Sequence, residues 1–301
     1  TANISLAFFW KSADLKKRRP ATTKTKAKTR TLILKINLKF IEIAYDQKQT
    51  YSIRIPVPPT KLTLDLENKL KKMTPITSEK FFGESYIGGN ESRLRYLNLK
   101  IPDLRALFTN EKMSEWTLTE IENLWFTSNI FEAKTLAIIW LEKQPTEFLL
   151  KNIQKIFKWA PHIDNWALSD GYCGILARVF EADSQKVLPT YKKWNKHKNS
   201  WLRRISIVGL LYYARARKVK PTFSLVISMV KPHLRAKEYY LQKGVGWTLR
   251  EAYNVYPKET TQFIVTNLSE IHSDAWYAAS EKMPLKLKQK LVLERRKRRQ
   301  K

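Results

Sequence analysis

Hydrophobic residues recur at spacings of three and four along most of the chain from about Leu62 onward. Clear examples are the segments LTEIENLWF at 118–126, AKTLAIIWLEK at 133–143 and FLLKNIQKIFKW at 148–159. This spacing places the apolar side chains on one face of an α-helix and the polar ones on the other. The pattern therefore predicts a series of amphipathic helices, most of them roughly 12 to 20 residues long.

Prolines separate these apolar repeats. Proline has no amide hydrogen to donate and clashes with the preceding helical turn, so each is expected to start or stop a helix. The predicted breaks lie at Pro145, Pro161, Pro189, Pro221, Pro232, Pro257 and Pro284. Many helices with short connections predict an all-α domain over residues 61–285, either a compact bundle or an α-solenoid of stacked helix pairs, and we favour the solenoid.

The two ends of the chain follow different patterns. Residues 1–30 are rich in Lys, Arg and Thr, as expected of a basic arm without fixed structure. Within residues 31–60, LILKINLKFIEI and YSIRI alternate apolar and polar positions, the period of a strand, so this extension could form a short β-hairpin. Residues 286–301 form a basic tail.

The charge of the chain narrows the class of partner. Lys and Arg number 56 against 27 Asp and Glu, a formal net charge of +29. The two ends contribute much of this excess, but the helical domain keeps more basic than acidic residues. Such an excess indicates a polyanionic partner, with nucleic acid the leading candidate, and basic residues gathered on one working face. A generally solubilising surface is the alternative.

The sequence gives little support for a metal site, a disulfide or redox site, or a membrane-spanning segment. Cys173 is the only cysteine, so there is neither a disulfide framework nor a thiolate zinc site. The histidines show no metal-ligand spacing: they are His162, His197, His233 and His272. No apolar run reaches the roughly 18 to 20 residues that span a bilayer. We expect no cofactor or metal, and a soluble monomer in the cytoplasm, associated with the nucleoid.

Tryptophan stands within one helical turn of a charged residue in three stretches. In the first, WALSD at 166–170, Trp166 and Asp170 stand at i and i+4, so on a helix they share one face and present an indole beside a carboxylate. For this motif alone, the commoner explanation is that Trp166 lies in the core and that Asp170 is only a solvated or salt-bridged acid.

The second stretch, WLRR at 201–204, follows a plausible N-cap at Asn199 or Ser200. It places Arg203 and Arg204 at a helix start, where a cation opposes the helix dipole. A phosphate contact would compensate, since guanidinium and helix N–H groups both bind phosphate oxygens. A salt bridge to a neighbouring helix explains either arginine equally well.

The third stretch, GVGWTLRE at 244–251, places Gly244 and Gly246 inside a predicted helix, with Trp247 and Arg250 at i and i+3. Glycine costs up to about 1 kcal/mol in a helix interior. Its use here indicates close approach of a ligand or of another backbone to this turn. Packing between helices explains the glycines as well as a ligand does.

In this order the motifs W-x-x-x-D, W-x-x-R and G-W-x-L-R-E resemble those of the AlkD-like DNA alkylation repair glycosylases. FFG at 81–83, IPDLRALF at 101–108 and LWFTSNIFEAKTLAIIWLEK at 124–143 extend the resemblance, which covers about residues 65–285. It implies an α-solenoid of HEAT-like repeats whose basic concave face holds duplex DNA. It also implies an enzyme that excises purines alkylated at N3 or N7.

By position in these motifs, the resemblance implies the roles of individual residues. Asp170 matches the catalytic carboxylate, Trp166 and Trp247 match the aromatics facing the deoxyribose, and Arg204, chosen over Arg203 by its spacing, matches the arginine near the DNA backbone. Further DNA contacts are expected from Arg203, Arg250, Lys243 and Trp201.

The chemistry suits these residue types. An alkylated purine that is already cationic leaves without a general acid, so the barrier lies in positive charge developing on the sugar. A carboxylate and indole faces both stabilise such a cation.

Two other functions fit a basic helical protein. One is a non-catalytic HEAT-repeat protein that binds bent or branched DNA, and the other is an adaptor for an acidic protein. Asp170 argues against the first, because a carboxylate facing phosphate weakens DNA binding. Salt-dependent DNA affinity would exclude the second.

Overall fold

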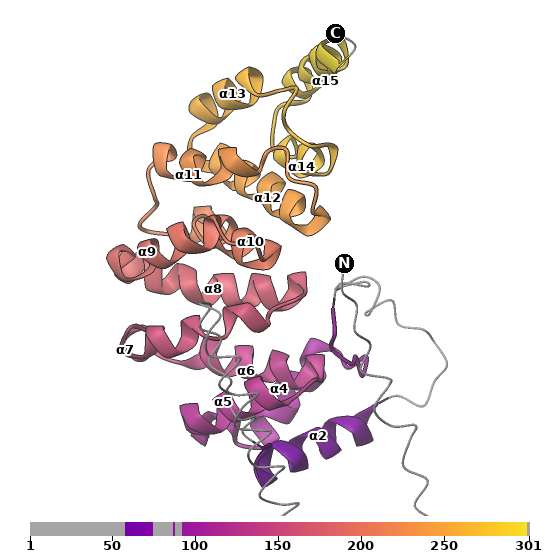
Figure 1. The fold of residues 1–301 in the computed structure, drawn as a ribbon, viewed down its shortest axis with the longest axis vertical. Helices are drawn as coiled ribbons and strands as arrows, with labels where there is room; N and C mark the ends of the chain where they lie inside the picture. Colours follow the sequence, from indigo (N-terminus) through magenta and orange to yellow (C-terminus); the bar gives the residue numbers. More distant parts are fainter. Residues whose placement is uncertain (1–57, 75–86, 88–91, 300–301) are drawn as a thin grey trace, which may run out of the picture. The chain divides into compact units, whose positions relative to one another are not determined.

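The computed structural model describes residues 58–74, 87 and 92–299, which form an all-α stack of helices (Figure 1). This confirms the predicted fold class. Within the described residues the only β-type pairing is an isolated parallel bridge between Arg95 and Ile130. The predicted basic arm of residues 1–30 lies outside the described residues, as does the suggested hairpin of 31–60 apart from its last three positions.

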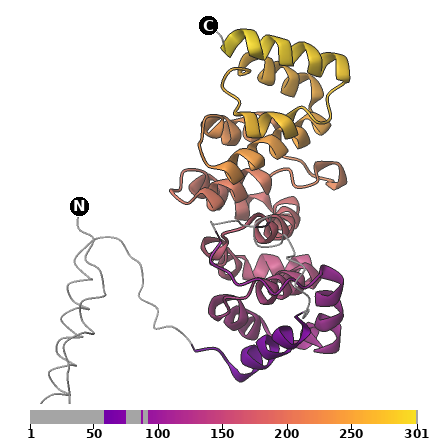
Figure 2. The same ribbon diagram turned by 90° about the vertical axis from the view of Figure 1, so that its right-hand side faces the viewer.

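One row of helices runs through the stack, and each member contacts the next. We call it the central row: α6 (Phe131–Lys143), α8 (Trp166–Ala182), α10 (Ser200–Val208), α12 (Tyr239–Val255) and α14 (Ser273–Ala279). Figure 2 shows the same succession from another side. Because α10 contacts both α8 and α12, side chains from these three helices can meet at one place.

The remaining helices flank the central row or close its ends. The flanking helices pack on central helices and are α5 (Leu118–Thr127), α7 (Thr146–Phe157), α9 (Ser184–Asn195), α11 (Phe223–Val230) and α13 (Pro257–Thr266). The ends carry α2 (Lys61–Met73), α4 (Ile101–Asn110) and α15 (Leu285–Arg299). Single 3-10 turns connect some of them: η3 (Met113–Glu115), η4 (Ala160–His162), η5 (Ala214–Ala216) and η6 (Lys231–His233).

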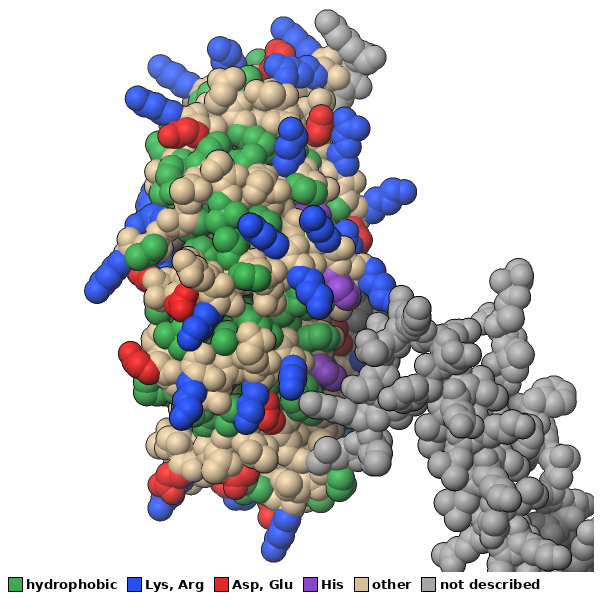
Figure 3. Space-filling view, turned by 60° about the vertical axis from the view of Figure 1, so that its left-hand side comes forward, with side chains coloured by type: hydrophobic (Ala, Val, Ile, Leu, Met, Phe, Trp, Pro, Cys, Tyr) green, Lys and Arg blue, Asp and Glu red, His purple; other side chains and the backbone are tan. Residues whose placement is uncertain are grey.

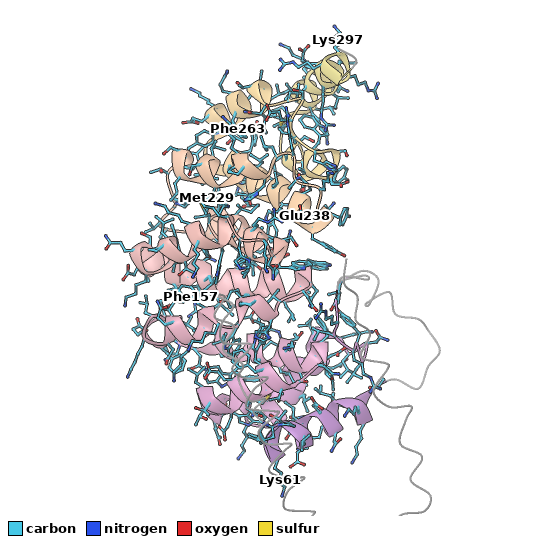
Figure 4. All side chains as sticks on the ribbon, viewed as in Figure 1. Lys61, Phe157, Met229, Glu238, Phe263 and Lys297 are labelled. Carbon is cyan, nitrogen blue, oxygen red and sulfur yellow. The ribbon has the colours of Figure 1, made fainter. Side chains whose placement is uncertain are left out.

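Apolar side chains of both rows fill the space between the ribbons and form one continuous core (Figure 4). Two fully buried indoles, Trp125 and Trp159, stack with their ring centres 4.9 Å apart. No helix in the described part of the chain is long and apolar enough to cross a membrane.

Most of the predicted proline breaks are confirmed. Pro145 is the N-cap of α7, Pro257 is the first residue of α13, and Pro161 and Pro232 lie in 3-10 turns. The break predicted at Pro189 is wrong.

Pro189 lies inside α9, which continues to Asn195. Proline there removes the hydrogen bond to the carbonyl of Gln185. Both residues are exposed, so water can hydrate that carbonyl and the helix is not interrupted.

A glycine permits a close contact between two helices of the central row. A Cβ built on Gly246 of α12 would lie 2.4 Å from the backbone oxygen of Ala275 in α14. No side chain fits at that distance, so the backbones of the two helices are in direct contact at this turn. Of the two explanations for the glycine, the structure therefore shows packing between helices.

Candidate functional site

An ion pair joins two central helices where the tryptophan motifs converge. The Arg204 Nη2 atom donates to Asp170 Oδ1 at 2.6 Å, which connects α10 to α8. Its Nη1 atom donates to the backbone oxygen of Tyr240 at 2.8 Å, which adds the first turn of α12. Only 4% of the Arg204 side chain and 16% of the Asp170 side chain are exposed. The guanidinium is therefore an internal partner that holds the carboxylate near the surface.

Gly244 provides the space for this arginine. A Cβ at Gly244 would lie 3.0 Å from Arg204 Nη1 and 3.1 Å from its Cγ. A side chain here would crowd Arg204, which would have to shift to make room. The close approach predicted at this glycine is thus made by a side chain of the protein itself.

Burial and the arginine act in opposite directions on the carboxylate. Burial raises the pKa of Asp170, whereas the charge and hydrogen bond of Arg204 lower it. The pKa of a carboxyl group in this position depends strongly on the neighbouring Arg204, because low-dielectric surroundings strengthen the attraction between the two charges. The arginine therefore favours the ionised form of the acid, whereas burial favours the protonated form.

The helix that carries Asp170 begins one turn before it. Asn165 is the N-cap of α8, and its side chain accepts a hydrogen bond of 3.0 Å from the Leu168 amide. Trp166 is the first helical residue and is half-buried. The helix predicted from WALSD is thereby confirmed, and Trp166 and Asp170 lie on one face of it.

Three aromatic side chains form a wall beside this pair. The Trp247 ring lies 5.4 Å from the ring of Tyr212 and 5.7 Å from that of Tyr213. Tyr212 packs on Gly174, one turn after Asp170, where a Cβ would lie 3.1 Å from the ring. Burial raises the pKa of Tyr212, and the charge of Asp170 raises it further. The carboxylate and the aromatic wall are therefore close neighbours.

Tyr213 differs from its neighbours in backbone geometry. Its φ angle is +47°, in the left-handed region that a bulky side chain rarely adopts, and 55% of the residue is exposed. Such outliers gather at functional sites, where surrounding structure maintains them. Sequence reasoning missed both tyrosines; the available signal was the adjacent YY in GLLYYARAR, directly after the arginine helix.

The other residues predicted to bind DNA are engaged in contacts within the protein. Arg203 forms an ion pair with Glu238, which Figure 4 labels at the start of α12. For Arg203 as for Arg204, the structure thus shows the salt-bridge alternative. Trp201 is buried, and its ring lies 5.1 Å from that of Tyr240.

Two further predicted DNA contacts lie on α12. Arg250 bonds to Glu281 at 2.9 Å and lies 5.6 Å from the Trp247 ring, so it supports the aromatic wall. Lys243 is half-buried, with its amine 5.7 Å from the Tyr239 ring.

On the face drawn in Figure 3, Lys and Arg side chains are spread from one end of the described residues to the other. They are not gathered into a single patch on this face.

The all-α stack of helix pairs defines an AlkD-like helical repeat protein. The chain belongs to the family described as DNA alkylation repair enzyme, whose model matches residues 65–283. Membership gives the protein a role in DNA alkylation repair, with DNA as its partner.

One solved structure supports this fold, and a second is less similar. A predicted DNA alkylation repair enzyme from Enterococcus faecalis superposes with a TM-score of 0.52 at 13% identity, covering 76% of this chain and 97% of that one. AlkD2 from Streptococcus mutans gives a TM-score of 0.46 at 16% identity, covering 73% and 98% of the two chains. Comparison with curated proteins finds no match.

Proposed function

We propose that the protein is a DNA glycosylase that excises cationic N3- and N7-alkylated purines from duplex DNA. The observation that carries the proposal is Asp170, a mostly buried carboxylate held by Arg204 beside an aromatic wall. A DNA-binding protein gains nothing from such a carboxylate, because it repels phosphate. An enzyme that generates a cation on a sugar benefits from such a carboxylate, because the negative charge stabilises the cation.

The lesion and the protein each contribute to the proposed reaction: the lesion supplies a good leaving group, and the protein stabilises the charge on the sugar. The alkylated base carries a positive charge and leaves with the electrons of the glycosidic bond, so no side chain has to protonate it. Positive charge then develops on the deoxyribose, and the Asp170 carboxylate stabilises it and orients the attacking water. The water oxygen bonds to the anomeric carbon and its proton passes to solvent.

The aromatic residues add to this stabilisation. Trp166 and Trp247 offer ring faces, each of which attracts a desolvated cation by about 1 to 2 kcal/mol. Arg204 acts as a positioning residue in this scheme, because its guanidinium is buried and bonded to Asp170. This assigns it a different role from the backbone contact that the motif resemblance implied.

The test measures release of 7-methylguanine from duplex DNA under single-turnover conditions. Asp170→Asn should lower the rate by roughly 100- to 1000-fold, the usual loss on removing one electrostatic group, while DNA binding persists. Asp183→Asn is the matched control. Asp183 caps α9 and asparagine caps helices equally well, so its rate should not change.

The same assay separates the rival function. A duplex carrying hypoxanthine, a neutral base, should not be cleaved, because that base cannot leave without a general acid. Binding by the intact protein without release of any base would refute the glycosylase and leave a protein that recognises bent or branched DNA.

A further inference from the structure

Helix α15 has no part in the proposed reaction. It spans Leu285–Arg299, and the family match ends at residue 283. Residues 286–301 hold nine Lys or Arg and a single Glu. The structure shows that most of this predicted basic tail is a helix, and one face of it contacts the body of the protein while another is exposed.

One face fixes α15 to the body of the protein. Leu291 is 3% exposed, and the Arg295 Nη2 atom donates to the Ile271 carbonyl at 2.6 Å. Arg298 donates to the Val265 carbonyl at 2.8 Å, and its Nε atom bonds to Glu294. These bonds satisfy carbonyls at the end of α13 and in the loop after it. Leu291, Arg295 and Arg298 are spaced by four and three residues, so they share this docked face.

A separate, exposed face carries lysines. Lys286, Lys290 and Lys297 are all exposed and are separated by four and seven residues. At about 100° per residue they fall within a sector of roughly 40°, whose middle is about 120° around the helix axis from Leu291. None of the three has an ion pair with any residue that the structure describes. We call them the lysine stripe; at 1.5 Å per residue it is about 16 Å long.

We propose that the lysine stripe is a second, sequence-independent binding surface for the phosphates of duplex DNA. Duplex DNA carries about one negative charge per 1.7 Å of its axis, so a stripe of this length faces several phosphates at once. The helix is already docked, so binding does not have to order its backbone. Lysine suits the task, because its ammonium is a compact charge that contacts phosphate without fixed geometry. The proposal depends on DNA as the partner and not on base excision.

The neighbouring apolar side chains favour phosphate over an apolar ligand. Leu285, Val292 and Leu293 border an open depression of about 470 Å³, but every lining residue belongs to α15 itself. No second wall encloses an apolar side chain there. A lipid surface remains the other polyanion that an exposed basic helix could meet, and the test includes it.

The experiment compares two triple variants of the full chain. The first is Lys286→Gln, Lys290→Gln and Lys297→Gln. The matched control is Lys151→Gln, Lys155→Gln and Lys158→Gln on the exposed side of α7, which removes the same charge from a flanking helix. Binding to an undamaged duplex is measured at several salt concentrations, and circular dichroism confirms that both variants fold.

Each phosphate contact contributes about 0.9 to the slope of log K against log salt. The stripe variant should lose about 2 to 3 from that slope, and the control less than about 1. An unchanged slope in the stripe variant, or equal losses in both, would overturn the proposal. So would a stripe variant that binds DNA normally but no longer binds anionic phospholipid vesicles.

Failure of this proposal is distinguishable from failure of the glycosylase. The slopes use undamaged DNA and need no catalysis. If the enzyme is active, the stripe variant should release 7-methylguanine at the normal rate once DNA is saturating.

Discussion

Replacing Arg204 with methionine tests whether this arginine acts through the Asp170 carboxylate. Methionine has a similar length but no charge, so it fills the space beside Gly244 and leaves the acid without its cation. Burial already raises the pKa of Asp170, and Arg204 opposes that rise. Its removal should raise the pKa further, and the protonated acid cannot stabilise a sugar cation.

The size of the effect follows from the contact. The paired atoms are 2.6 Å apart, which places the charge centres about 4 Å apart. At an effective dielectric constant of 20, two such charges attract by about 4 kcal/mol. Relaxation and water recover part of this, so we expect at least about 1.4 kcal/mol to remain, a factor of ten.

The assay is the single-turnover release of 7-methylguanine between about pH 6 and about pH 8.5. The ratio of the rate at high pH to that at low pH should be larger in Arg204→Met than in the unmodified protein, by up to about tenfold for each unit by which the pKa of Asp170 rises further. Arg203→Met, on the same helix but paired with Glu238, should leave the ratio unchanged.

A rate that falls by the same factor at every pH would refute the reasoning and return Arg204 to a direct role on DNA. Breaking a buried ion pair can cost about 3 to 5 kcal/mol of stability. Arg204→Lys is therefore measured alongside: it keeps the cation, and its ratio should fall between those of the methionine variant and the unmodified protein.

Two further outcomes follow from the structure. Tyr213→Asn should lower base release about fivefold, equivalent to about 1 kcal/mol of lost aromatic contact with the cation, without lowering the melting temperature, because asparagine tolerates the left-handed backbone. The control Tyr277→Asn removes another exposed tyrosine and should not change release; equal losses would exclude a local role for Tyr213. His233 is buried, and burial together with the charge of Arg203 lowers its pKa from 6.5 to about 4. The unfolded chain then binds the extra proton, so the stability contributed by the neutral imidazole is complete above about pH 6.5 and is lost towards about pH 4, by up to about 1.4 kcal/mol per pH unit. The free energy of unfolding in urea should fall less between about pH 7 and about pH 5 in His233→Gln than in the unmodified protein. Equal falls in the two proteins would contradict this role of His233.

Local sequence was sufficient to predict the helices and to place one pair of site residues on the same helical face. Helical periodicity depends on neighbours three and four positions apart, so α5, α6, α7 and the motif helices could be predicted from the chain alone. The shared face of Trp166 and Asp170 is likewise a property of a single helix. Asn199 caps α10, with its side chain accepting from the Trp201 amide at 2.8 Å, as the residue type predicted.

Partners that come from different helices were decided only by the tertiary structure. Arg203 and Arg204 are adjacent and chemically identical, yet packing turns one towards Glu238 on α12 and the other towards Asp170 on α8. Tyr212 and Tyr213, which follow α10, belong to the aromatic wall only because their loop lies against Trp247 and Gly174. In the same way, Gly244 matters because Arg204 crosses it, a contact between positions 40 residues apart along the chain. Sequence alone determined which side chains share a helical face; the rotation and spacing of helices against one another, set by packing of the whole core, decided which faces meet.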